Sequence, residues 1–128
     1  MSSPSPTELR AITVLVSDLV GSTELFARVG TVATDQLRER LFAITRAALF
    51  HHAGREIKNL GDRSLGVFDS ATAAVYCAIA LQRSLDKDNR RRRDGELVVR
   101  IGITTGEATL RGGDVPSRSR SALGALIG

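Results

Sequence analysis

A strand-like run that passes directly into a helical pattern, Ile12–Glu24 (ITVLVSDLVGSTE), constrains the fold of this chain more than any other stretch. Its first part is apolar and mostly β-branched, as in a strand buried within a sheet. The run ends at Asp18, and a turn then leads into a helix for which Ser22 or Thr23 is the expected N-cap. The pattern therefore predicts a strand, a sharp turn and a helix in direct succession.

The residues of this turn suit a divalent cation and the phosphate groups that accompany it. The Asp18 carboxylate is a hard oxygen ligand of the kind that Mg²⁺ prefers. Free N–H groups at the start of a helix attract phosphate oxygens. The alternative interpretation is an aspartate that only ends a strand and caps a turn, because short motifs match often by accident.

Composition describes an ordinary soluble domain. A chain of 128 residues with 42% apolar and 25% charged residues can bury a core as one domain. No apolar run approaches the roughly 20 residues that span a bilayer, and no secretory signal opens the chain. The single Cys77 excludes an internal disulfide and lies on a helical pattern, so we expect a buried thiol in a reducing cytoplasm. The net charge of +4 arises from Arg90–Arg93, since the remaining basic and acidic residues balance at 14 each (18 − 4 = 14 basic, 14 acidic).

The order of apolar patterns predicts an α+β fold. We assign residues 1–10 to a flexible leader, 11–114 to the core domain and 115–128 to an irregular tail. The expected elements are a strand over Ala11–Ser17, a helix over Thr23–Val29 closed by Gly30, a helix over Ala33–His52, a hairpin of Arg55–Leu60 and Leu65–Phe68, a helix over Ala71–Leu85 capped by Ser70 or Asp69, a charged loop over Asp86–Gly95, a strand over Leu97–Thr104 and a return strand over Ala108–Arg111. This β-α-β-β-α-β order, with a further strand, matches a ferredoxin-like split βαβ sheet with helices on one face.

Two acidic residues distant in the chain are predicted to meet in this topology. The first strand and the hairpin strand pair lie at the centre of such a sheet, so the end of the first strand and the Gly61-Asp62 turn can share one edge. Asp18 and Asp62, 44 positions apart, would then form a two-cation site for phosphoryl or nucleotidyl transfer. Two carboxylates this close would repel each other without metal. His51 and His52 are interpreted as favourable charges at a helix C-terminus, with metal ligation as the alternative.

Three segments, in this order, carry a family resemblance: V-S-D-L-V-G-S-T-E at Val16–Glu24, G-R-E-I-K-N-L-G-D at Gly54–Asp62 and V-R-I-G-I-T-T-G-E at Val99–Glu107. Together they resemble the class III adenylate/guanylate cyclase domain, in its bacterial, actinobacterial-type form, from about Ile12 to Asp114. The resemblance implies a ferredoxin-like core, conversion of ATP or GTP to the cyclic 3′,5′-monophosphate and pyrophosphate, and active sites between two cyclase domains, usually of a homodimer.

The resemblance also implies roles for individual residues. Asp18 and Asp62 match the two catalytic, metal-binding aspartates that hold two Mg²⁺ or Mn²⁺ ions, and the Leu19 carbonyl matches a backbone metal ligand. The turn of Val20, Gly21, Ser22 and Thr23 matches the segment beneath the nucleotide phosphates. Lys58 matches the base-recognising lysine of adenylate cyclases, which can donate to adenine N1, so ATP is favoured over GTP. Asp114 matches the second base-recognising position. Without the resemblance, Lys58 would be interpreted as an exposed strand lysine.

The chain departs from the family pattern in two places. The family has a compact residue after the hairpin aspartate, where this chain has Arg63. The family continues beyond the last hairpin with a helix that bears Asn and, four residues on, an Arg that stabilises charge on the transferred phosphate. This chain reads Val115–Arg120 and stops at Gly128, so we expect a truncated or frame-altered cyclase domain with weak or no turnover.

Two other functions remain as alternatives. A non-catalytic dimerisation or regulatory module could retain the cyclase fold. RNA binding is the other, because ferredoxin-like sheets and arginine runs both occur in RNA-recognition domains. Such domains read bases with aromatics on central strands, and the strands expected here contain only Phe68. Neither nucleic acid nor membrane is therefore an expected partner.

Overall fold

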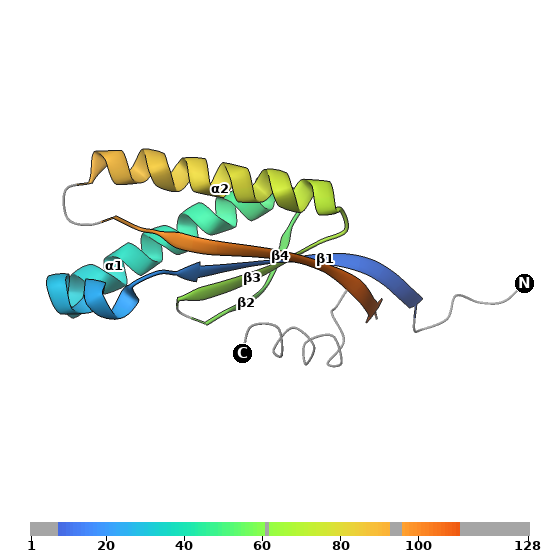
Figure 1. The fold of residues 1–128 in the computed structure, drawn as a ribbon, viewed down its shortest axis with the longest axis horizontal. Helices are drawn as coiled ribbons and strands as arrows, with labels where there is room; N and C mark the ends of the chain where they lie inside the picture. The colour runs from blue at the N-terminus through green and yellow to red at the C-terminus, as the bar shows by residue number, and fades with distance from the viewer. Residues whose placement is uncertain (1–7, 61, 93–95, 111–128) are drawn as a thin grey trace, which may run out of the picture.

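Two long strands, β1 (Glu8–Leu19) and β4 (Val99–Leu110), pair antiparallel along their whole length. The computed structural model describes residues 8–60, 62–92 and 96–110 of the chain. Within them, β2 (Arg55–Asn59) and β3 (Arg63–Phe68) complete an antiparallel sheet of order β2-β3-β1-β4. The helices α1 (Ser22–His51) and α2 (Ala71–Arg91) run along the sheet (Figure 1). The predicted ferredoxin-like fold is confirmed. The expectation that the hairpin strand pair lies at the centre with the first strand is wrong for β2: β3 and β1 are central, and β2 is at an edge.

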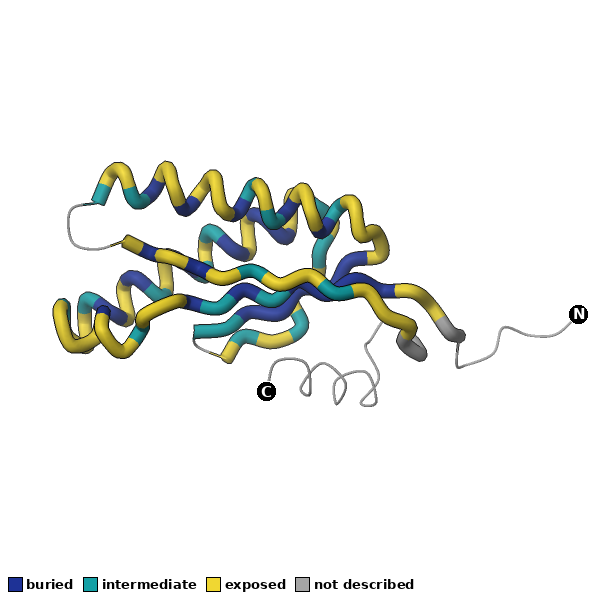
Figure 2. Tube along the Cα trace, viewed as in Figure 1, coloured by how far each residue is buried: buried dark blue, intermediate teal, exposed yellow. Residues whose placement is uncertain are grey.

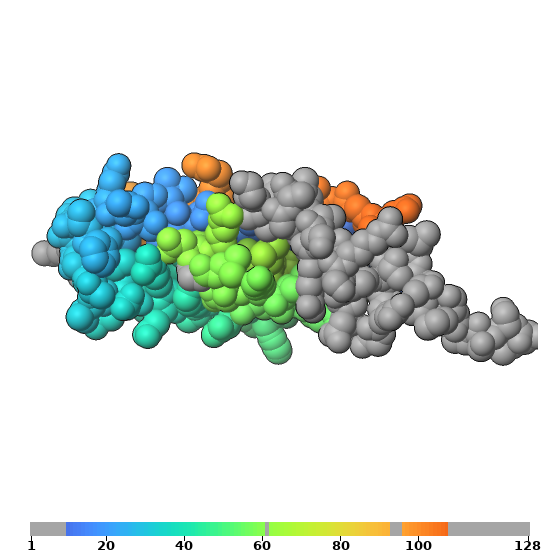
Figure 3. Space-filling model, turned by 90° about the horizontal axis from the view of Figure 1, so that it is seen from below, coloured from blue at the N-terminus to red at the C-terminus, as the bar shows by residue number. Residues whose placement is uncertain are grey.

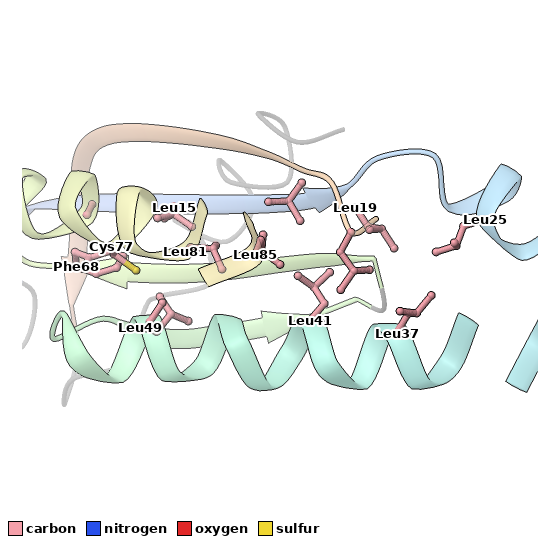
Figure 4. Packing of buried hydrophobic residues seen from close by; sticks show 14 residues of the cluster. Leu15, Leu19, Leu25, Leu37, Leu41, Leu49, Phe68, Cys77, Leu81 and Leu85 are labelled. Carbon is pink, nitrogen blue, oxygen red and sulfur yellow. The ribbon is translucent and has the colours of Figure 1, made fainter. Parts of the chain in front are cut away.

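β1 is buried on both faces, which explains its nearly continuous apolar sequence. Leu15 and Leu19 face the helices and belong to the main core, which also contains Leu41 of α1 and Leu81 of α2 (Figure 4). The alternate residues of β1 belong to a second apolar cluster with side chains of β2 and β3, on the sheet face opposite the helices: Ile12, Val14, Val16, Ile57, Leu65 and Val67. Both helices therefore cover one face of the sheet, as predicted, and buried residues follow one another along the central strands β1 and β3 (Figure 2).

The helix that follows β1 is interrupted at Gly30, as the sequence predicts. Gly30 has φ 84° and ψ 176°, a conformation outside the helical region, so α1 consists of two helical segments on either side of this residue. The predicted N-cap is wrong: Gly21, at φ 71° and ψ 31°, caps α1 without a side-chain hydrogen bond, and Ser22 is already helical. Glycine adopts this left-handed conformation without the steric penalty of a side chain.

The charged segment after Leu85 is mostly helical, and the predicted loop over Asp86–Gly95 is therefore wrong as far as Arg91. Ion pairs one turn apart, Asp86–Arg90 and Asp88–Arg92, support this extension of α2. Its N-cap is Ser70, whose Oγ accepts a hydrogen bond from the Ala73 N–H at 3.1 Å. Ser70 was one of the two predicted caps.

The predicted return strand is also wrong. β4 runs without a turn through Gly106, which pairs with Ile12, to Leu110, which pairs with Glu8. β1 begins at Glu8, so residues 8–10, assigned to the leader, provide partners for the end of β4. A continuous ladder satisfies the backbone hydrogen bonds that a turn would interrupt. In the part of the chain that the structure covers, neither helix has the length and apolar character to cross a membrane.

Candidate functional site

Three backbone segments meet where β1 ends. The Leu19 N–H donates to the Asp62 carbonyl at 2.8 Å, and the Val20 N–H donates to the Val98 carbonyl at 2.8 Å. The end of β1, the turn between β2 and β3, and the residue before β4 are thus joined. Seen from below the sheet, the green hairpin lies next to the blue segment that contains the start of α1 (Figure 3). The sheet thus brings together the two segments that carry Asp18 and Asp62.

Asp18 lies on the sheet face opposite the helices, in a row of charged residues that crosses three strands. Its backbone pairs with Arg63 of β3 on one side and with Arg100 of β4 on the other. The Arg63 Nε lies 3.7 Å from the Asp18 Oδ1, and the two side chains are 40% and 33% exposed. All three residues line a cavity of about 430 Å³ whose other walls include Val16 and Ile103. Asp18 is therefore a partly exposed carboxylate flanked by two arginines.

Asp62 contacts a different arginine. The Arg38 Nε of α1 donates to the Asp62 Oδ1 at 2.8 Å, with both side chains about 30% exposed (30% and 31%). Asp62 and Arg38 line a cavity of about 260 Å³ together with Ser22, Thr23 and Phe26. This cavity lies at the start of α1, where the first backbone N–H groups lack intrahelical acceptors. Asp62 thus faces the predicted phosphate-binding turn.

The structure joins the two segments through the backbone hydrogen bond between Leu19 and Asp62, while the two carboxylates line different cavities. Among the residues that the structure describes, the cavities that contain Asp18 and Asp62 share no lining residue. Within the described ranges, no three His, Cys, Asp or Glu side chains gather closely enough to hold a metal ion. The donor set still suits Mg²⁺ or Mn²⁺, because two carboxylates and the nearby Leu19 carbonyl are hard oxygen ligands. Joint coordination would compete with the arginine that each carboxylate contacts.

The other predicted site residues lie further apart. Val20 is 41% exposed and Gly21 caps α1, so the predicted turn is on the surface beside the Asp62 cavity. Lys58 is an exposed residue of β2, beside a β-bulge, and lines neither cavity. Asp114 lies outside the described residues.

The two histidines end α1, as the sequence indicated. His51 lies in the last turn, and His52 Nδ1 lies 2.9 Å from the Ala48 carbonyl at the C-cap. This arrangement agrees with the helix-terminus interpretation. Neither histidine lines the Asp18 cavity or the Asp62 cavity.

Sequence reasoning missed the two arginines that complete these cavities. Arg38 lies off the apolar stripe of α1, where the sequence pattern predicts a solvent-facing side chain. Arg100 lies at an outward position of a strand, and its place beside Asp18 depends on the β1–β4 register. Arg63 was noticed only as a departure from the family pattern. A helix side chain that reaches a hairpin turn leaves no local signal in the sequence.

Residues 5–118 match the family model of the adenylate and guanylate cyclase catalytic domain. The chain belongs to this family. It is 31% identical over 106 residues to the adenylate cyclase of Streptomyces coelicolor (strain ATCC BAA-471 / A3(2) / M145), a match that covers 83% of this chain and 26% of that relative. A protein of Rhizobium meliloti (strain 1021) is 32% identical over 107 residues, or 83% of this chain, and the match spans 18% of its length. The chain thus spans about a fifth to a quarter of these curated relatives.

Solved cyclase structures share the fold. The guanylyl cyclase Cya2 superimposes with a TM-score of 0.71 at 28% identity, over 80% of this chain and 57% of that chain. The adenylyl cyclase CyaB from P. aeruginosa superimposes with a TM-score of 0.70 at 27% identity, over 80% and 59% of the two chains. One of these relatives is a guanylyl cyclase and the other an adenylyl cyclase, so the comparisons support the catalytic-domain family without selecting a nucleotide.

Proposed function

We propose that this chain is a nucleotide cyclase domain that binds ATP with two divalent ions, Mg²⁺ or Mn²⁺, and converts it to 3′,5′-cyclic AMP and pyrophosphate. The observation that carries the proposal is the Leu19–Asp62 hydrogen bond, which joins the two segments that bear the aspartates. Cyclase domains bind nucleotide substrates with divalent ions and function as dimers. A second copy of this chain, or another cyclase domain, is accordingly the proposed partner, in the cytoplasm.

The proposed metal ligands are Asp18, Asp62 and the Leu19 carbonyl. When bound, divalent ions would neutralise phosphate charge and favour attack by an oxygen nucleophile. The chain's own contribution is to hold one carboxylate at the end of β1 and the other in the β2–β3 turn, at a sheet end where the Leu19 and Val20 N–H groups are hydrogen-bonded. The backbone hydrogen bonds therefore fix the positions from which the side chains would reach the ions.

The proposed nucleotide contacts come from two other elements. The N–H groups of Gly21, Ser22 and Thr23 lie where α1 begins and would donate to phosphate oxygens. Lys58 is exposed and has an ammonium that can donate to adenine N1, an acceptor that guanine lacks in its usual tautomer. Asp114 is the proposed second contact to the base. These assignments favour ATP over GTP.

We expect slow turnover from the 128-residue polypeptide by itself. Residues 115–128 contain no Asn-x-x-x-Arg pattern, which the resemblance implies for this part of the family's catalytic domain. The loss of one transition-state donor lowers kcat by about 10²–10³-fold in enzymes that depend on it.

The test is calorimetric titration of the purified chain with a non-hydrolysable ATP analogue, with and without Mn²⁺, alongside an assay of cyclic AMP formation. We expect binding that requires Mn²⁺, weaker binding of the GTP analogue, and slow cyclic AMP production. The substitution Asp18→Asn should reduce binding, whereas the control Asp86→Asn, on an exposed turn of α2, should not. Equal binding with and without Mn²⁺ would contradict the proposal.

The second candidate is a non-catalytic dimerisation or regulatory module with the same fold. The pairing of Asp18 with Arg63 and of Asp62 with Arg38 favours it, because both carboxylates already have cationic partners. Absence of metal-dependent nucleotide binding, with the fold intact, is the result that this candidate predicts. RNA binding has no comparable support: Phe68, the one aromatic residue in the described strands, is 1% exposed and cannot stack on a base.

A further inference from the structure

We propose that Arg38 and Arg63 are internal competitors of the divalent metal, and that they set the metal affinity of this domain by pairing with Asp62 and Asp18. This inference rests on the proposed function, since it concerns the same two carboxylates. It assigns a role to two arginines that the three family-like segments do not explain. Metal binding would exchange a guanidinium for a divalent ion at each aspartate.

The Arg38–Asp62 contact supports this exchange most directly. The guanidinium reaches from α1 to the hairpin turn, 24 positions away, and its Nε donates to the carboxylate at 2.8 Å. It lines the same cavity of about 260 Å³ as Ser22 and Thr23. The positive charge thus lies in the cavity that the carboxylate shares with the start of α1, where metal and phosphate are proposed to bind. An ion that binds Asp62 there competes with Arg38 for the carboxylate.

Arg38 has a second acidic partner, with which it can remain paired when it releases Asp62. Its Nη1 lies 3.5 Å from the Asp35 Oδ1, one turn earlier on α1, and Asp35 is 61% exposed. Arg38 therefore bridges Asp35 and Asp62. When Asp62 binds a metal ion, Arg38 can remain paired with Asp35 on the surface of the helix. This partner lowers the free energy needed to release Asp62 from the guanidinium.

Arg63 occupies the corresponding position at the other carboxylate. It follows Asp62 in the chain and is the cross-strand partner of Asp18, with Nε 3.7 Å from Oδ1. Arg100 flanks Asp18 from the opposite strand and lines the same cavity. The Asp18 carboxylate therefore lies in a positive local field that weakens the attraction of a cation.

The exposure of these ion pairs indicates that they can exchange. Arg38, Arg63 and their two aspartates have side chains that are 30–40% exposed (30%, 40%, 31% and 33%). Ion pairs at such exposure are weak, and a divalent ion carries twice the charge of a guanidinium. Each pair should therefore lower metal affinity only modestly, by about twofold to fivefold. Metal would still bind, but at higher free concentration.

The experiment is a titration of the full chain with Mn²⁺ alone, in which free Mn²⁺ is measured by electron paramagnetic resonance. We expect Arg38→Gln and Arg63→Gln each to tighten Mn²⁺ binding by about twofold to fivefold. The matched control is Arg46→Gln, because Arg46 is also on α1 and also pairs across elements, with Glu56 at 3.3 Å. It removes the same charge and should leave the affinity unchanged. Misfolding cannot produce the expected result, since a disrupted site binds more weakly.

A substitution that is expected to weaken Mn²⁺ binding strengthens the test. The substitution Asp35→Asn removes the second partner of Arg38, so it should weaken Mn²⁺ binding, whereas Asp86→Asn, which removes the same charge from α2, should have a smaller effect. If Arg46→Gln tightens binding as much as Arg38→Gln does, net charge is responsible and the inference is wrong. If the wild type binds Mn²⁺ and the arginine variants bind it equally, the inference alone fails. If no variant binds Mn²⁺, the proposed metal site fails and the inference fails with it.

Discussion

At the residue scale, the carboxylate of Asp88 is buried in its ion pairs, in contrast to those of Asp18 and Asp62. Its side chain is 5% exposed and is bound by Arg40 of α1 and by Arg92 at the end of α2. The hydrogen bond from Arg40 is the main reason that the pKa of Asp88 lies below its ordinary value. Partners from two helices hold this pair in place, whereas the pairs at Asp18 and Asp62 are about a third exposed. The buried pair is thus structural and the exposed pairs can exchange.

We expect Asp88→Asn to lower the free energy of unfolding by about 1–3 kcal/mol at pH 7, because it removes charge-assisted hydrogen bonds from a buried group. A depressed pKa in the folded state contributes stability that is present above the ordinary aspartate pKa and lost as pH falls through the folded value. The difference between wild type and variant should therefore shrink at pH 3. Urea unfolding at both pH values measures it, with the exposed Asp86→Asn as control. A difference that is the same at both pH values would contradict this account.

Cys77 provides a second prediction at this scale. It is 1% exposed among the residues of the main core, and burial raises the pKa of its thiol to about 11. Because the thiolate is the reactive form, the native protein should react very slowly with a disulfide reagent at pH 8. One thiol per chain should react rapidly once denaturant is added. Rapid reaction of the native protein would show that the thiol is accessible.

At the scale of elements, Gly30 was a reliable signal of a helix break, whereas Gly106 did not mark a turn and the charged run after Leu85 did not mark a loop. The break in α1 at Gly30 was predicted because a glycine follows the first helical pattern. The end of α2 was misjudged because the run after Leu85 is charged, and only its buried Asp88 and its i,i+4 pairs reveal a helix. The burial of Asp88 depends on Arg40 of α1 lying alongside, which local pattern does not reveal.

Replacement of Gly30 tests the break. At φ 84° and ψ 176°, any residue with a side chain is strained, although an added Cβ would meet nothing within 4 Å. We expect Gly30→Ala to lower the free energy of unfolding by about 1–3 kcal/mol through backbone strain alone. Gly106→Ala is the matched control, since Gly106 also has open space around it and lacks a positive φ. Equal effects of the two substitutions on thermal unfolding would contradict this account.

At the scale of the whole molecule, element order predicted the sheet and the layer of helices, because a β-α-β-β-α-β chain has few ways to pack. It also predicted that β1 and the hairpin turn would meet. The directions of the Asp18 and Asp62 side chains could not be predicted, since they depend on strand register and on Arg38 reaching across from α1. The length of β4 was also missed. Its partners at residues 8–10 lie in a polar stretch, which was assigned to the leader.

The central claim is that Asp18 and Asp62 serve one metal site, although in this structure each carboxylate contacts a different arginine. The most direct test is a double-mutant cycle on Mn²⁺ affinity with Asp18→Asn, Asp62→Asn and the double variant. If the carboxylates share the bound ions, each single substitution should weaken binding by about tenfold or more, and the double variant should be little weaker than the worse single. Independent, additive losses, or no loss in either single variant, would show that the two aspartates do not form one site.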